Sequence, residues 1–84
     1  MTTLNNVKKG YVIKIISIPD TRVRAQAIRF GIAENAVAKI VEIVPGGPII
    51  IEKGKQEIAL GRDLAKTIKI EIISGSNNLF KKEA

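Results

Sequence analysis

The residues best able to do chemistry in this chain are its charged side chains, because its 84 residues include neither histidine nor cysteine. The sequence therefore lacks the commonest general base, the thiolate nucleophile and the usual ligands of transition metals. The eight acidic residues are spread evenly, and no two have a spacing that would bring their carboxylates together. We predict that the protein is not an enzyme and has no cofactor. The alternative of a weak module that binds a divalent transition metal stays open, and its site would have to be oxygen-rich.

Basic residues outnumber acidic ones by 14 to 8, which gives a net charge of +6 and favours an anionic partner. Arg22, Arg24 and Arg29 fall within one predicted helix, and a guanidinium suits bidentate contact with a carboxylate or phosphate. Together with Lys39, these arginines are our candidates for contact with a partner. The alternative, that they form only a solvated helix face, stays open.

Nucleic acid is a second candidate partner, suggested by the positive charge. A groove for single strands needs several exposed aromatic side chains on which bases can stack. The only aromatics are Tyr11, Phe30 and Phe80, and Phe30 is assigned to the core. The sequence therefore disfavours nucleic acid, and the groove that proline-rich peptides require lacks aromatics for the same reason.

The run Pro45-Gly46-Gly47-Pro48 has two glycines together, as phosphate-binding loops often do. Such a loop would continue with lysine and serine or threonine into a helix. Here Ile49-Ile50-Ile51 follows, which is typical of a strand. We interpret the run as a tight turn between two strands.

One helix is predicted after Asp20, whose side chain can cap its start. Val23, Ala27 and Phe30 recur at i, i+4 and i+7 and form an apolar stripe, which assigns Phe30 to the core. Gly31 stands where a glycine commonly ends a helix. The predicted helix is too short to be stable alone, so it must pack on a sheet.

Four strands are predicted from alternating or continuous runs rich in isoleucine and valine, at 11–18, 37–44, 49–53 and 68–72, and a fifth, 56–60, forms a hairpin with 49–53. Gly54-Lys55 predicts a two-residue hairpin turn with a positive φ at the glycine. In the first two strands, polar residues stand three apart, which predicts bent strands with bulges. Ile49-Ile50-Ile51 is assigned to a hydrophobic edge strand, which could pair between chains if left uncovered, so a homo-oligomer is possible.

These elements predict a mainly β fold, a small and partly open barrel of about five strands with one short helix after the first strand. Residues 1–73 form the domain, and 74–84 form a polar, basic tail. A short helical turn is expected at 61–66. Neither a signal peptide nor a run of about 20 apolar residues is evident, so we expect a cytoplasmic protein.

From Lys9-Gly10 to Ile70 the chain resembles the FeoA family. Matching features include Gly10 before the first strand, the helix end Arg29-Phe30-Gly31-Ile32, the turn 45–48, and Ala59-Leu60 in the hairpin. Each motif is weak alone, but their order and spacing together are fairly specific. The family usually has glycine where this chain has Asn35, and asparagine is the next-best residue for a left-handed backbone position.

The resemblance implies an SH3-like barrel, a fold also found as the C-terminal domain of DtxR-type metal-dependent repressors. It further implies a cytosolic accessory that docks on FeoB, the membrane transporter for ferrous iron with a GTP-binding domain. Membrane contact would then occur only through this partner, and no small-molecule substrate is expected.

Overall fold

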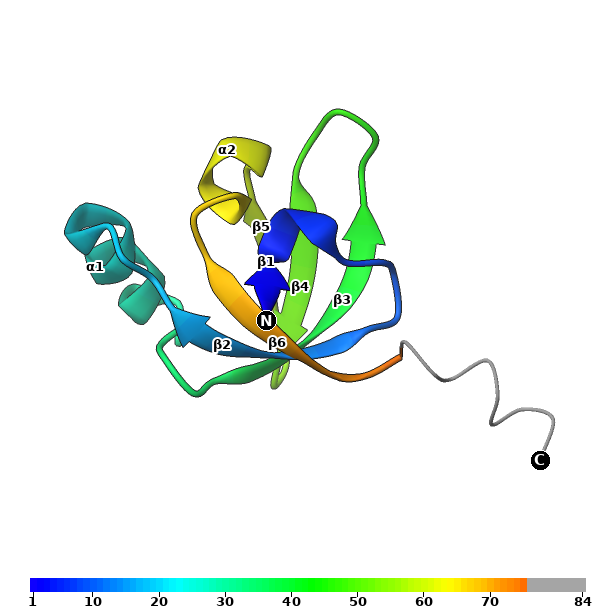
Figure 1. Cartoon of the computed structure of the whole chain (residues 1–84), viewed down its shortest axis with the longest axis horizontal. Helices are drawn as coiled ribbons and strands as arrows, with labels where there is room; N and C mark the ends of the chain where they lie inside the picture. Colours follow the sequence, from blue (N-terminus) through cyan, green and yellow to red (C-terminus); the bar gives the residue numbers. More distant parts are fainter. Residues whose placement is uncertain (76–84) are drawn as a thin grey trace, which may run out of the picture.

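The computed structural model describes residues 1–75. Its elements follow the predicted order, with additions at the N-terminus (Figure 1). They are β1 (Thr2–Thr3), the 3-10 helix η1 (Leu4–Asn6), β2 (Val12–Ser17), α1 (Thr21–Arg29), β3 (Val37–Ile43), β4 (Ile49–Lys53), β5 (Gln56–Leu60), α2 (Arg62–Ala65) and β6 (Lys69–Ser74). Most of the predicted tail, 76–84, lies outside the described residues, and Ser74 is the last residue of β6.

All six strands form one antiparallel sheet in the order β1-β6-β2-β3-β4-β5. The sheet curls upon itself, but its two edge strands, β1 and β5, are not paired with each other. This arrangement confirms the predicted small, partly open barrel, with six strands instead of five. The extra strand, β1, has only two residues, too few to produce a recognisable alternation in the sequence.

Bulges bend the two strands in which they were predicted. The pairing of β2 with β6 shifts register between Val12 and Ile13 and again before Ser17. The pairing of β3 with β4 shifts between Ile40 and Glu42. This shift in β3 lets Lys39 and Glu42, three residues apart, both lie exposed on the outer surface. Such bulges increase the local twist that closing a small sheet requires.

Isoleucine dominates the core. Ten large side chains are fully buried: Leu4, Ile13, Ile15, Ile18, Ile32, Ile40, Ile49, Ile51, Ile68 and Ile70. Within residues 1–75 no polar or charged residue is buried. The β-branched side chains favour strands, and they fill the barrel without leaving polar groups that need internal partners.

The N-terminal segment closes one end of the core, a role that the sequence did not predict. The Leu4 side chain is fully buried, and its backbone N–H donates a hydrogen bond to the Ile68 carbonyl at 2.9 Å. Val7 is also buried. The only signal was two apolar residues three apart, which is too short a pattern to identify a helical turn.

The predicted turns have the expected geometry. Gly54 has a φ of 63° in a two-residue hairpin loop that joins the paired residues Lys53 and Gln56. Asn35 has a φ of 78°, and its N–H donates to the Ile15 carbonyl at 2.7 Å. Asparagine thus occupies the left-handed position, as predicted.

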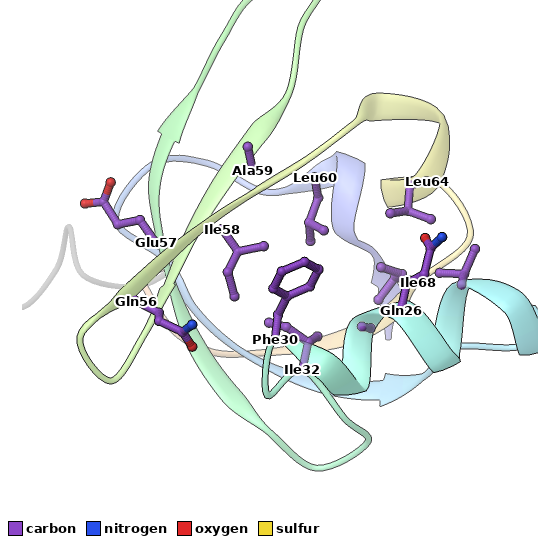
Figure 2. A pocket seen from close by; sticks show the side chains of 12 residues that line it. Gln26, Phe30, Ile32, Gln56, Glu57, Ile58, Ala59, Leu60, Leu64 and Ile68 are labelled. Carbon is purple, nitrogen blue, oxygen red and sulfur yellow. The ribbon is translucent and has the colours of Figure 1, made fainter.

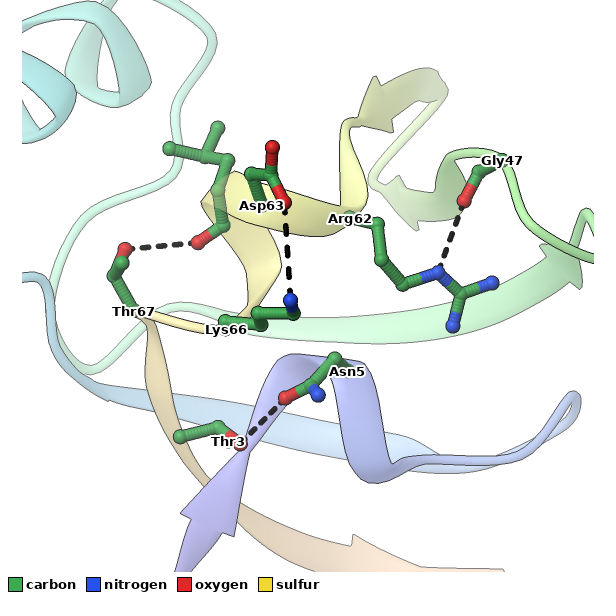
Figure 3. A network of polar contacts seen from close by, with 8 residues as sticks. Thr3, Asn5, Gly47, Arg62, Asp63, Lys66 and Thr67 are labelled. Carbon is green, nitrogen blue, oxygen red and sulfur yellow. Dashed lines mark hydrogen bonds and ion pairs between the residues drawn. The ribbon is translucent and has the colours of Figure 1, made fainter.

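The turn 45–48 connects β3 with β4 and is fastened from α2 (Figure 3). The Arg62 side chain donates from Nε to the Gly47 carbonyl at 3.2 Å and from Nη2 to the Val44 carbonyl at 3.0 Å. A Cβ on Gly47 would lie 2.9 Å from a Val44 methyl carbon, so the turn has no room for a larger residue there. The run of two glycines is a tight turn, as we interpreted it.

The prediction that Ile49-Ile50-Ile51 could form a free edge is wrong. These residues belong to β4, which pairs with β3 on one side and β5 on the other. The hairpin turn after β4 places β5 outside it, so the free edge belongs to Gln56–Leu60.

Candidate docking groove

Helix α1 forms one wall of the candidate site, and its first residue is fixed by a side-chain cap. The Asp20 carboxylate accepts hydrogen bonds from the backbone N–H groups of Arg22, at 2.8 Å, and Val23, at 3.2 Å. These donors have no partner within the helix, so the cap stabilises its start. The predicted cap is confirmed.

The other end of α1 is held by a glycine in the left-handed conformation. Gly31 has a φ of 79°, and its N–H donates to the Ile28 carbonyl at 3.0 Å. The Ile32 N–H donates to the Ala27 carbonyl at 2.9 Å, which completes a Schellman motif. The buried Ile32 therefore ties the end of the helix to the barrel core.

An apolar groove of about 420 Å³ separates α1 from the edge strand β5 (Figure 2). Its apolar lining comes from α1, β5, α2 and the segments next to them: Val23, Ala27, Phe30, Ile32, Ile58, Ala59, Leu60, Leu64 and Ile68. Polar side chains of Gln26, Gln56 and Glu57 lie at its margins. An apolar floor with a few polar groups at the rim is typical of a binding site.

Phe30 is not a core residue, contrary to the prediction. Its side chain is 47% exposed, and its ring reaches over the groove toward Ile58 and Leu60 (Figure 2). Ala27, one turn earlier in the same stripe, is buried. The helical period places Phe30 on the correct face, but the helix ends there, above the gap that the barrel leaves open.

The three arginines do not share one face of α1. Arg22 and Arg29 belong to one row of the helix with Gln26 between them, at i, i+4 and i+7. Gln26 lines the groove, and the helical period places the two exposed arginines next to it. This flank of α1, which borders the groove without lining it, is called the rim. Within the described chain neither arginine is in an ion pair, so the rim carries uncompensated positive charge.

Arg24 lies on another side of the helix, about 160° from Arg22 at 3.6 residues per turn. Its Nη2 contacts the Glu34 carboxylate at 3.1 Å, and both side chains are 43% exposed. Arg24 therefore fastens α1 to the loop that follows it. Lys39 lies on the outer face of β3, with Glu52 of β4 as its cross-strand neighbour, and not on the helix.

Among residues 1–75, no three acidic side chains come close enough to hold a metal ion. The longest of the described helices has nine residues, so none is long and apolar enough to cross a membrane.

Sequence reasoning missed the groove itself. It predicted both walls, α1 and the strand 56–60, but it placed Phe30 in the core. The distance between two elements that are far apart in the chain depends on how the sheet curls. The spacing of apolar residues within one helix carries no information about that distance.

Comparisons with known proteins identify the fold and the family. A family model described as the FeoA domain matches residues 2–72. The crystal structure of an iron uptake regulatory protein (FeoA) is 25% identical and superposes with a TM-score of 0.78, covering 86% of this chain and 97% of that one. A FeoA-like protein from Clostridium acetobutylicum is 26% identical, with a TM-score of 0.76 and 88% of each chain covered.

The same fold occurs within larger proteins. The metal-dependent transcriptional regulator MtsR superposes with a TM-score of 0.78 at 16% identity, over 86% of this chain and 34% of the regulator. Comparison with curated proteins by sequence gave no match. Because the family model spans nearly all of the described residues, the chain belongs to the FeoA family, which is associated with ferrous iron transport.

Proposed function

We propose that this protein is a non-catalytic accessory of ferrous iron transport that docks on the cytosolic side of a FeoB-type membrane transporter. The observation that carries the proposal is the groove, an apolar surface that the protein leaves open beside a half-exposed phenylalanine. Apolar contacts at the centre of a protein interface, surrounded by polar groups, supply most of its binding energy.

Arg22 and Arg29 on the rim, and Lys39 on the outer face of β3, are the proposed charged contacts. Arginine at a rim mainly speeds association with an acidic surface and fixes its orientation. Arg24 is a weaker candidate, because Glu34 already occupies its guanidinium. In this proposal the cytoplasm is the site of action, and the membrane is reached only through the transporter.

The test is capture of the transporter from detergent-solubilised membranes of the host, using tagged protein at moderate salt and mass spectrometry to identify what is bound. We expect a FeoB-type transporter to be recovered. The variant Arg22→Ala/Arg29→Ala/Lys39→Ala should recover less of it. A matched control, Lys8→Ala/Lys9→Ala/Lys69→Ala, removes the same charge from other exposed positions and should recover the normal amount.

Recovery of nucleic acid or ribosomes without the transporter would contradict the proposal. Binding to nucleic acid would also weaken steeply with salt, by roughly 0.7–0.9 log units of affinity per phosphate contact for each log unit of salt. Equal recovery by the two triple variants would leave docking intact but remove the charged contacts from it.

A further inference from the structure

The groove has a feature beyond its apolar lining: one of its walls is the free edge of a β-sheet. Strand β5 pairs with β4 on one side only. Lys53 and Gln56 flank the two-residue turn and are paired, so Gln56, Ile58 and Leu60 direct their backbone groups toward β4. Glu57 and Ala59 direct theirs the other way, along the groove.

These outward groups have no backbone partner. Within residues 1–75, no backbone or side-chain hydrogen bond connects Glu57 or Ala59 to another element. Both residues are exposed and line the groove. The edge thus presents two N–H donors and two C=O acceptors at the margin of an apolar surface, which is the arrangement that an added strand requires.

Apolar side chains beside this edge could contact every second residue of such an added strand. Phe30, Leu64 and Ile58 lie around the groove (Figure 2). A volume of about 420 Å³ falls within the range of sites that hold small ligands or a few side chains. An extended segment with apolar residues at every second position would bury them here while its backbone pairs with β5.

The charges around the groove select an acidic occupant. Arg22 and Arg29 lie on the α1 rim, and the Lys53 ammonium lies beside Gly31, 3.6 Å from where a Cβ on that glycine would be. Among the described residues, none of these three cations is in an ion pair. Glu57 is the one acidic residue of the lining.

The same charges disfavour the two other occupants that the chain itself could supply. A second copy would bring its own rim cations and a net charge of +6 to the same place. The chain's own C-terminal segment contains Leu79-Phe80, but Lys81-Lys82 follow directly. Like charges placed together in this way oppose binding.

We propose that the groove binds an extended, acidic segment of a partner protein by strand addition, with the segment's backbone pairing with Glu57 and Ala59 of β5. This inference rests on the function proposed above and specifies how the partner is held. The added strand would occupy the gap between the edge strand and α1.

The test uses a synthetic probe, a blocked ten-residue peptide in which valine alternates with threonine and two glutamates stand at one end. Amide hydrogen exchange by NMR should show new protection at Glu57 and Ala59 in the complex and little change at Gln56. A peptide with lysines in place of the glutamates should bind more weakly, and high salt should reduce the difference.

Two N-methylated versions of the peptide provide a matched pair. Alternate amides of a strand face opposite edges, so only one set can pair with β5. Methylation of that set should weaken binding about tenfold, as expected for two lost hydrogen bonds, whereas methylation of the other set should not. Equal effects of the two, or binding without protection at Glu57 and Ala59, would overturn strand addition.

The variant Ala59→Pro tests the same point from the protein side. Its N–H faces away from β4, and proline is tolerated on an edge strand in that orientation. The variant should fold but lose the peptide, whereas Ala59→Val should keep it. If Ala59→Pro does not fold, the N-methylated pair decides.

Failure of this inference is distinguishable from failure of the proposed function. Capture of the transporter by Ala59→Pro as well as by the unaltered protein would preserve the function and overturn strand addition. If the unaltered protein binds the peptide but does not capture the transporter, strand addition stands and the proposed function falls. Protection of Glu57 and Ala59 without peptide, in a concentration-dependent dimer, would make a second copy the occupant and overturn the inference.

Discussion

The two sides of the barrel are built from the same kinds of residue but differ in strand pairing and in burial. On the sealed side, formed by β6, β2, β3 and β4, every strand has a neighbour on both edges, and most of the inward isoleucines are fully buried. On the open side, formed by α1, β5 and the groove between them, one strand edge is unpaired and Phe30 is half exposed. Stability therefore comes mainly from the sealed side, whereas the open side has backbone and apolar groups that are free to contact a partner.

The largest expected effect is on the sealed side. Ile40→Ala removes a fully buried side chain from the centre of β3 and should lower the free energy of unfolding by about 2–5 kcal/mol. Urea denaturation followed by circular dichroism measures this loss. The control is Ile28→Ala on the exposed side of α1, where a change of less than about 0.5 kcal/mol is expected. Equal losses for the two variants would contradict the contrast.

An intermediate effect is expected where α1 joins the barrel. Gly31→Ala places a Cβ on a residue with a φ of 79° and should cost about 1–2 kcal/mol. Space is not the cause, because only the flexible Lys53 side chain lies within 4 Å of the new Cβ. Gly31→Asn should cost less, since asparagine tolerates this conformation. If alanine were harmless, the Schellman motif would not fix the position of α1.

A smaller effect on stability than at Ile40 or Gly31 is expected in the groove. Phe30→Ala should lower the free energy of unfolding by less than about 1.5 kcal/mol, because only about half of the ring surface is buried against the protein. The same variant should lose most of its affinity for the strand-forming peptide, and Phe30→Leu should keep more. A stability loss as large as that of Ile40→Ala would mean that Phe30 is a core residue in solution, as the sequence suggested.

Local features were predictable because they depend on neighbouring residues. Asp20 caps α1 since its carboxylate reaches amides two and three residues ahead. Gly54 and Asn35 occupy left-handed positions because glycine has no Cβ and asparagine tolerates this conformation. The bulges in β2 and β3 followed from polar residues three apart, which a flat strand would point to opposite faces.

Features that join distant parts of the chain were not predictable in this way. The sequence assigned Phe30 to the core because its period was correct, yet the end of α1 lies over the opening between β5 and the rest of the barrel. It treated three arginines as one group, although Arg24 turns toward Glu34. It also gave β4 the free edge that belongs to β5.

The sequence by itself determined the fold, because isoleucine-rich strands, caps and turns act over a few residues and agree with one another. Its lack of histidine and cysteine also limited the chemistry that the protein can do. Only the tertiary structure decided that the edge of β5 beside α1 stays unpaired and that Phe30 stays exposed. Those outcomes depend on how far a short, twisted sheet curls before its edges meet, which is a property of the whole barrel.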